Sequence, residues 1–125
     1  MASERKELLG DIEQCSKVLN FEQALVLYKE ASDLKPNKIE VYLKLGRTYE
    51  RIKDYEEAIS NFKKALRRNK KSFMAWYRMG LACMKCGLRK DGIEALLKAY
   101  KIDPDNVSCL VKLGEIYSRD DKKML

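Results

Sequence analysis

The sequence predicts an all-α protein built as a solenoid of antiparallel helix pairs, and three observations carry this prediction. Apolar residues recur with helical spacing along almost the whole chain of 125 residues. Gly46, Gly80 and Gly114 stand 34 residues apart, which is the spacing of a repeated structural unit. Only two prolines and six glycines interrupt the chain, as expected for long helical segments.

The composition is that of a single folded domain covering residues 1–125. Hydrophobic residues make up 46% and charged residues 36% of the chain, which is typical of a helical domain and not of a disordered segment. No apolar run approaches the roughly 20 residues needed to cross a bilayer. The charged start, MASERKELLG, has no apolar core of the kind that a secretory signal needs. We therefore expect a cytoplasmic or nuclear protein without a membrane segment.

The residues around the three glycines follow one pattern. Large or apolar residues stand four before, one before and three after each glycine: Tyr42, Trp76 and Leu110; Leu45, Met79 and Leu113; Tyr49, Cys83 and Tyr117. Further on, small residues flank a large one: Ala58, Phe62 and Ala65; Gly92, Leu96 and Ala99. The same spacing extends backwards to Leu8, Cys15, Ala24, Tyr28 and Ala31.

This pattern resembles the tetratricopeptide repeat (TPR) family, W-x2-LG-x2-Y…A-x3-F…P. The resemblance covers residues 5–125, as repeats 5–38, 39–72 and 73–106 and an incomplete fourth repeat, 107–125. The second repeat is the closest match, whereas the first has Asp-Ile where Leu-Gly is usual. The resemblance implies a right-handed superhelix of about three and a half repeats, each with two helices, A and B.

Local signals mark where these helices begin and end. Asn20 with Gln23, and Asp54 with Glu57, have the spacing of a capping box and predict the start of helix B in two repeats. Prolines end helices between repeats, at Pro36 and Pro104. The last helix A is expected to run from Val107 to about Arg119, followed by a loop and the first residues of a fourth helix B. It should pack backward through Leu110, Leu113 and Tyr117, leaving Val107, Val111 and Ile116 exposed.

The four cysteines predict neither a metal site nor a redox site. Cys83-x-x-Cys86 is a single pair, the other cysteines are distant in the repeat, and the chain has no histidine. Because Cys83 occupies the position held by Tyr49 and Tyr117, we interpret it as a core residue. No phosphate loop and no nucleophile with a base are found, so we expect neither a cofactor nor catalysis.

The candidate binding site comes from the resemblance, which implies that ligands contact helix A at positions 2, 5, 6, 9, 12 and 13. Counted from residues 39, 73 and 107, position 6 is always a cation, and an apolar residue stands beside it at position 5. We therefore expect a groove that binds an acidic or amphipathic peptide segment of a protein partner. Its residues are Leu43, Lys44, Arg47, Arg51, Tyr77, Arg78, Val111 and Lys112. The cations at position 13, Lys17, Arg51, Lys85 and Arg119, are explained at least as well by a solvated helix face.

Other interpretations remain open. The net charge of +7 and the basic run KKALRRNKK, residues 63–71, allow a single-stranded RNA-binding repeat or a nuclear-import signal. The run lacks interleaved aromatic residues, and favourable helix-dipole placement explains it better. The carboxylate clamp by which some TPR domains hold chaperone tails is present only in fragments. A regulatory segment of a larger enzyme is a further alternative.

We therefore expect a non-catalytic adaptor or scaffold module, part of a larger protein or complex. The exposed last helix adds two alternative expectations, because repeat arrays usually end in a polar helix. Either the chain is a fragment of a longer array, which we favour, or another copy or another protein covers this end.

Overall fold

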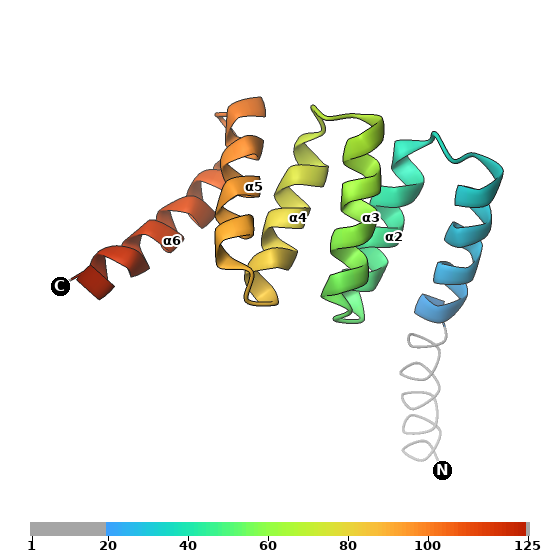
Figure 1. Ribbon diagram of the computed structural model, residues 1–125, viewed down its shortest axis with the longest axis horizontal. Helices are drawn as coiled ribbons and strands as arrows, with labels where there is room; N and C mark the ends of the chain where they lie inside the picture. Colours follow the sequence, from blue (N-terminus) through green and yellow to red (C-terminus); the bar gives the residue numbers. More distant parts are fainter. Residues whose placement is uncertain (1–19, 125) are drawn as a thin grey trace, which may run out of the picture.

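The computed structural model describes residues 20–124, with side chains over residues 20–119 (Figure 1). These residues form six helices and no strand, so the all-α prediction is confirmed for them. The helices are residues 20–34, α2 (Ile39–Arg51), α3 (Tyr55–Arg68), α4 (Phe73–Lys85), α5 (Arg89–Ile102) and α6 (Val107–Met124). The helix A expected in the first repeat lies outside the described residues, and so does the chain before the predicted cap at Asn20.

The helices stand side by side in chain order, so the molecule is a one-dimensional stack (Figure 1). Short turns of three or four residues connect neighbours, and the order of contacts follows the order of the chain. The helices α2 and α4 touch each other, whereas a cavity separates α3 from α5. We therefore place α2 and α4 on the concave side of the stack, as helices A. None of the helices in residues 20–124 has the length and apolar content needed to cross a bilayer.

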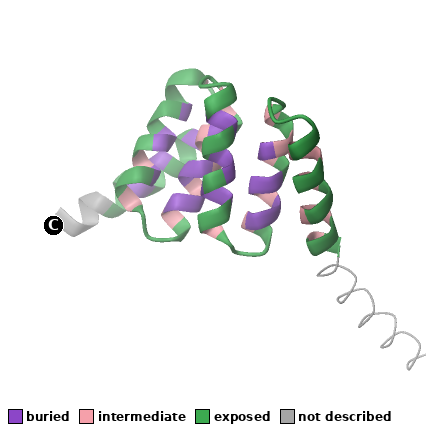
Figure 2. Ribbon diagram, turned by 45° about the vertical axis from the view of Figure 1, so that its right-hand side comes forward, coloured by how far each residue is buried: buried purple, intermediate pink, exposed green. Residues whose placement is uncertain are grey.

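Buried residues line the surfaces where helices face each other (Figure 2). Within each pair, glycine on helix A lets a large residue of helix B come close. A Cβ added at Gly46 would lie 2.5 Å from Cε1 of Phe62, and one at Gly80 would lie 2.8 Å from Cγ of Leu96. Phe62 and Leu96 are both fully buried. These glycines are needed because any side chain would push the two helices apart.

Side-chain caps start three of the helices. The Asp54 carboxylate accepts a hydrogen bond from the Glu57 N–H at 3.4 Å, which confirms the predicted start of α3. The second hydrogen bond of a capping box, from the Asp54 N–H to the Glu57 side chain, is not formed, because the Asp54 N–H donates to the Tyr49 carbonyl. Ser72 and Asn106, which the sequence analysis did not single out, cap α4 and α6 in the same way.

The turns from helix A to helix B need a residue with positive φ. Gly87 has a φ of 87° and Lys53 a φ of 65°, and these two residues are 34 apart. Glycine adopts this conformation without a steric penalty, whereas lysine does so at a cost. The turn is therefore imposed by the packing of the helices that it joins.

The prediction for the last helix was wrong in three respects. α6 does not end near Arg119 but continues to Met124, for 18 residues in all. Ile116 is buried, together with Cys109 and Leu113, because these residues face α5. Leu110 and Tyr117, expected to be covered, are 44% and 46% exposed. The equivalent positions of α2, Tyr42 and Tyr49, are buried against α3, the helix B of that repeat, and the described residues end with α6.

The two environments of glycine give a test of the packing. Gly46→Leu should lower the free energy of unfolding by about 3 kcal/mol, because the new side chain meets the buried Phe62 ring. Gly114→Leu should leave it unchanged or raise it by up to about 1 kcal/mol, because a Cβ there meets nothing within 4 Å and leucine favours helix. Urea unfolding followed by circular dichroism measures both values. Equal losses in the two variants would contradict this account.

Candidate functional site

The concave face brings four of the predicted groove residues together. Leu43, Lys44 and Arg47 on α2 and Arg78 on α4 line a hollow of about 120 Å³. Its other walls come from Glu40, Met74 and Phe62. The floor is therefore apolar, while three of the four predicted residues are cations. Such a site can take an apolar side chain and hold a carboxylate beside it.

Arg47 is the centre of the positive surface. It also lines a hollow of about 260 Å³ toward the helix 20–34, shared with Lys44 and Arg51, and one of about 430 Å³ shared with Arg51 and Arg78. Three adjoining hollows thus share Arg47, which is half-buried. The predicted residue Arg51, exposed at the end of α2, lies at the edge of this surface.

Arg78 is the most constrained of these cations. Its guanidinium lies 3.8 Å from the carboxylate of Glu50, and the Arg78 and Glu50 side chains are 29% and 11% exposed. Its Nε–H is buried and has no hydrogen-bond partner. A buried donor without an acceptor is unfavourable, whereas the ion pair with Glu50 stabilises the charge of this arginine.

The structure does not bring the other three predicted residues into these hollows. Tyr77 stacks on Phe73, with ring centroids 5.4 Å apart, and packs against the core at the C-terminal end. Val111 is 53% exposed on α6. Lys112 forms an ion pair of 3.5 Å with Glu115 on its own helix.

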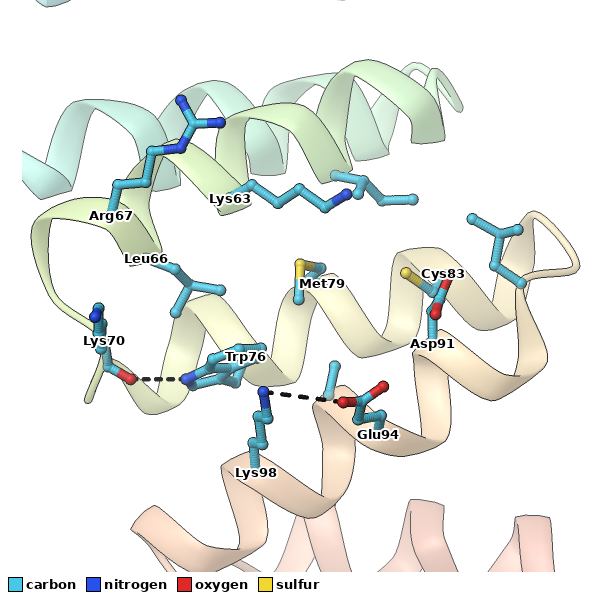
Figure 3. Close-up of a pocket in the computed structure, with 13 residues that line it drawn as sticks. Lys63, Leu66, Arg67, Lys70, Trp76, Met79, Cys83, Asp91, Glu94 and Lys98 are labelled. Carbon is cyan, nitrogen blue, oxygen red and sulfur yellow. Dashed lines mark hydrogen bonds and ion pairs between the residues drawn. The ribbon is translucent and has the colours of Figure 1, made fainter.

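A larger hollow, of about 590 Å³, lies on the opposite side of the stack, between α3 and α5 with α4 as its floor (Figure 3). Leu66, Met79 and Trp76 give it an apolar wall. Cations and carboxylates stand at its edge: Lys63, Arg67, Lys70, Asp91, Glu94 and Lys98. The sequence analysis missed this hollow, because it depends on the separation of two helices B and not on any motif.

Residues at the edge of this hollow contact one another and the backbone. The Trp76 indole N–H donates to the Lys70 carbonyl at 2.8 Å. The Lys98 ammonium lies 4.5 Å from the centre of the indole ring and 4.0 Å from Glu94 (Figure 3). Lysine over an aromatic face is a stabilising contact in a folded chain. The hollow therefore has a structural explanation and is not our candidate site.

The basic run, residues 63–71, contains a structural arginine. Arg68 donates from Nε to the Pro36 carbonyl at 2.9 Å, and its guanidinium lies 4.7 Å from the centre of the Tyr42 ring. Tyr42 donates its hydroxyl to the same carbonyl at 2.8 Å. Arg68 therefore joins the C-terminal end of α3 to the turn before α2, which gives this residue of the run a structural role.

The cysteines of the described chain do not form a metal site. No group of metal-ligating residues is found among residues 20–119. Cys83 is buried and Cys86 is exposed at the end of α4. Burial raises the pKa of the Cys83 thiol to about 11, with smaller contributions from Cys86 and Asp91. Cys83 thus stays a neutral core residue at physiological pH.

The difference in burial between Cys83 and Cys86 predicts that a thiol reagent labels Cys86 selectively. In a Cys15→Ser background at pH 8, iodoacetamide should modify Cys86 rapidly and leave Cys83 and Cys109 protected, because burial also raises the pKa of Cys109. Peptide mapping by mass spectrometry measures the labelled fraction at each site, and urea-unfolded protein gives the reference for full reactivity. Similar rates at Cys83 and Cys86 in the folded chain would contradict the assignment of Cys83 to the core.

Comparisons with known proteins agree with the geometry. Two family models described as tetratricopeptide repeat match residues 9–71 and 43–107. Anaphase-promoting complex subunit 3 of Schizosaccharomyces pombe is 31% identical over 105 residues, which is 82% of this chain and 16% of that protein. The TPR repeat-containing protein YpiA of Bacillus subtilis is 32% identical over 99 residues, 74% of this chain and 23% of that protein. The chain thus spans a small part of these relatives.

Solved structures share the fold. The crystal structure of MamA superposes with a TM-score of 0.77 at 29% identity and covers 85% of this chain and 62% of that one. The first TPR domain of RPAP3, bound to an HSP90 peptide, also has a TM-score of 0.77, at 19% identity, over 86% of this chain and 85% of that one. The chain belongs to the tetratricopeptide repeat family.

Proposed function

We propose that the chain is a non-catalytic interaction module that binds an acidic or amphipathic peptide segment of a protein partner on its concave face. One observation carries the proposal: Lys44, Arg47 and Arg78 converge from two helices around one apolar-floored hollow. Glu50 and Glu40 offset part of this positive charge, and the cations that exceed them attract an anionic partner.

The chemistry of the hollow indicates how a peptide would bind. A leucine-sized or aromatic side chain would rest on Leu43 and Met74, where apolar area is removed from water. A neighbouring carboxylate would accept hydrogen bonds from Lys44 and Arg47. Lys112 and Val111 would contact a peptide long enough to reach α6. The proposed binding surface therefore includes all three cations at repeat position 6, Lys44, Arg78 and Lys112.

Relatives support this class of function. YrrB, described as a TPR protein with an unusual peptide-binding site, has a TM-score of 0.71 at 25% identity, covering 78% of this chain and 50% of that one. Subunit 3 of the anaphase-promoting complex is by name part of a multi-subunit complex. By analogy, we propose that this module works within a larger assembly in the cytoplasm or nucleus.

A direct binding measurement tests the proposal. A fluorescein-labelled peptide with glutamates flanking a central leucine should bind the chain, and fluorescence anisotropy should show binding weaker by at least about tenfold for the Lys44→Glu, Arg47→Glu variant. The expected loss follows from removing two charge-assisted contacts, each contributing about 1.5–3 kcal/mol. A lysine-flanked peptide should not bind.

The matched control is Lys64→Glu, Lys90→Glu, which changes net charge equally at exposed positions on helices B. It should retain most of the affinity. If both variants lose binding equally, the interaction is a general charge effect and the groove proposal fails. Preferred binding of single-stranded RNA, lost in both variants, would favour the nucleic-acid alternative instead.

A further inference from the structure

The concave face has a second hollow, which adjoins the smaller one proposed to bind the peptide. It lies between α2 and α4 and reaches the turn before α3, and its volume is about 430 Å³. Arg47 and Arg78 line both hollows. Cations supply most of its lining: Arg47, Arg51, Lys53, Arg78 and Lys85. We call this space the basic hollow.

The described chain neutralises only part of this positive charge. Glu50, the one carboxylate among the described residues that line the basic hollow, already pairs with Arg78 at 3.8 Å. Asp54 is close in sequence, but it does not line the hollow, and its carboxylate accepts from the backbone at the start of α3. The other four cations form no ion pair within residues 20–119. The basic hollow therefore attracts an anion of more than one charge.

Lys53 has a backbone conformation that favours glycine. Its φ is 65°, and the residue 34 positions later is Gly87, with a φ of 87°. The packing of the helices imposes this turn, but glycine adopts it without the steric cost that lysine incurs. Backbone strain of this kind is found at positions whose side chain has a function. The side chain of Lys53 lines the basic hollow, which gives a reason for lysine at this position.

Helix stability explains two of the five cations equally well. Arg51 and Lys85 lie in the last turns of α2 and α4, where a positive charge offsets the helix dipole. Lys85 also lies 5.8 Å from the centre of the Tyr55 ring, which holds its ammonium near the hollow. The helix dipole does not explain Arg47 and Arg78, which precede the last turns. The convergence of cations from two helices and a turn on one hollow therefore needs another reason.

We propose that the basic hollow binds a phosphorylated serine or threonine of the partner peptide. This inference rests on the proposed function and specifies which peptides the concave face prefers. A phosphate carries nearly two negative charges at neutral pH and three acceptor oxygens, whereas a glutamate carries a single charge. Arg47 and Arg51 can each donate two hydrogen bonds to phosphate oxygens, and Lys53 and Lys85 add positive charge. Recognition of phosphate by clustered arginines is an established class of peptide binding.

The lining of the basic hollow selects the kind of phosphorylated residue and its place in the peptide. None of the described lining residues is aliphatic, and the Lys85 ammonium lies over the Tyr55 ring, so a phosphotyrosine ring would find no apolar wall. Leu43, in the smaller hollow, precedes Arg47 and Arg51 by about 6 and 12 Å along the helix. An extended peptide covers this distance in about two to four residues. The phosphorylated residue should therefore stand about three residues from the apolar anchor.

Three labelled peptides test this inference by fluorescence anisotropy. Each has a central leucine flanked by glutamates, and the positions three before and three after the leucine carry phosphoserine, serine or glutamate. The complete chain should bind the phosphoserine peptide at least about tenfold more tightly than the glutamate peptide, because phosphate adds charge-assisted hydrogen bonds. The Lys53→Gly, Lys85→Gln variant should lose this preference, since both lysines line the basic hollow and not the smaller one. Its affinity for the serine peptide should stay nearly unchanged.

The matched control is Lys64→Gln, Lys90→Gln, which removes the same charge at exposed positions on helices B and should keep the preference. Lys53→Gly by itself should not lower the urea midpoint followed by circular dichroism, because glycine adopts the turn without steric cost. A lower midpoint would show that lysine stabilises this turn, which contradicts the argument from strain.

Equal binding of the phosphoserine and glutamate peptides would overturn the inference. So would a preference that survives in the Lys53→Gly, Lys85→Gln variant, or one that the control variant loses to the same extent. Tighter binding of single-stranded RNA than of the phosphoserine peptide, lost in the Lys53→Gly, Lys85→Gln variant, would assign the basic hollow to nucleic acid instead. Binding of the serine peptide without a gain from phosphate refutes this inference alone, whereas failure of all three peptides refutes the groove proposal as well.

Discussion

The architecture depends on the contact between a glycine of one helix and a large side chain of the next. At Gly46 the Phe62 ring occupies the volume where a Cβ would be, and Leu96 does the same at Gly80. This contact fixes the distance within a helix pair, and Gly80 and Gly92 also bring two backbones close together. Because the pair is held so tightly, its remaining apolar surface can be buried only against the neighbouring pair, which produces a stack.

The stack places different chemistry on its two faces. Where α2 and α4 touch, the side chains that remain outside the core are directed to the concave face, and there the sequence supplies Lys44, Arg47 and Arg78. Where α3 and α5 separate, a hollow opens on the other face, and Trp76, Lys98 and Glu94 hold its edge through contacts with one another and with the Lys70 carbonyl. Trp76, Lys98 and Glu94 at the edge of the larger hollow thus already have partners within the chain. The smaller one combines an apolar floor with Lys44 and Arg47, which makes it the better candidate for a ligand.

Much of the fold could be predicted from the sequence, because the repeat spacing reports which residues face each other. The close packing at Gly46, the Asp54 cap and the burial of Cys83 all follow from positions 34 residues apart or from one local motif. The caps by Ser72 and Asn106 were missed, because neither is followed by the acidic residue of a capping box. The pairing of Arg78 with Glu50 and the hollow between α3 and α5 join residues from different repeats, and spacing within a repeat carries no information about them. For the candidate site, the sequence predicted its residue types but not which cations converge.

The error at α6 concerns residues whose burial depends on a neighbouring helix. A turn such as the one at Lys53, with φ of 65°, is unfavourable by itself and is maintained by the helix that packs back after it. α6 instead continues as one helix to Met124, and the described residues contain no helix that packs back on it. The same absence leaves Leu110 and Tyr117 uncovered, although their sequence positions are those of core residues. A repeat position therefore predicts burial only together with the helix that faces it, as the burial of Tyr42 and Tyr49 against α3 illustrates.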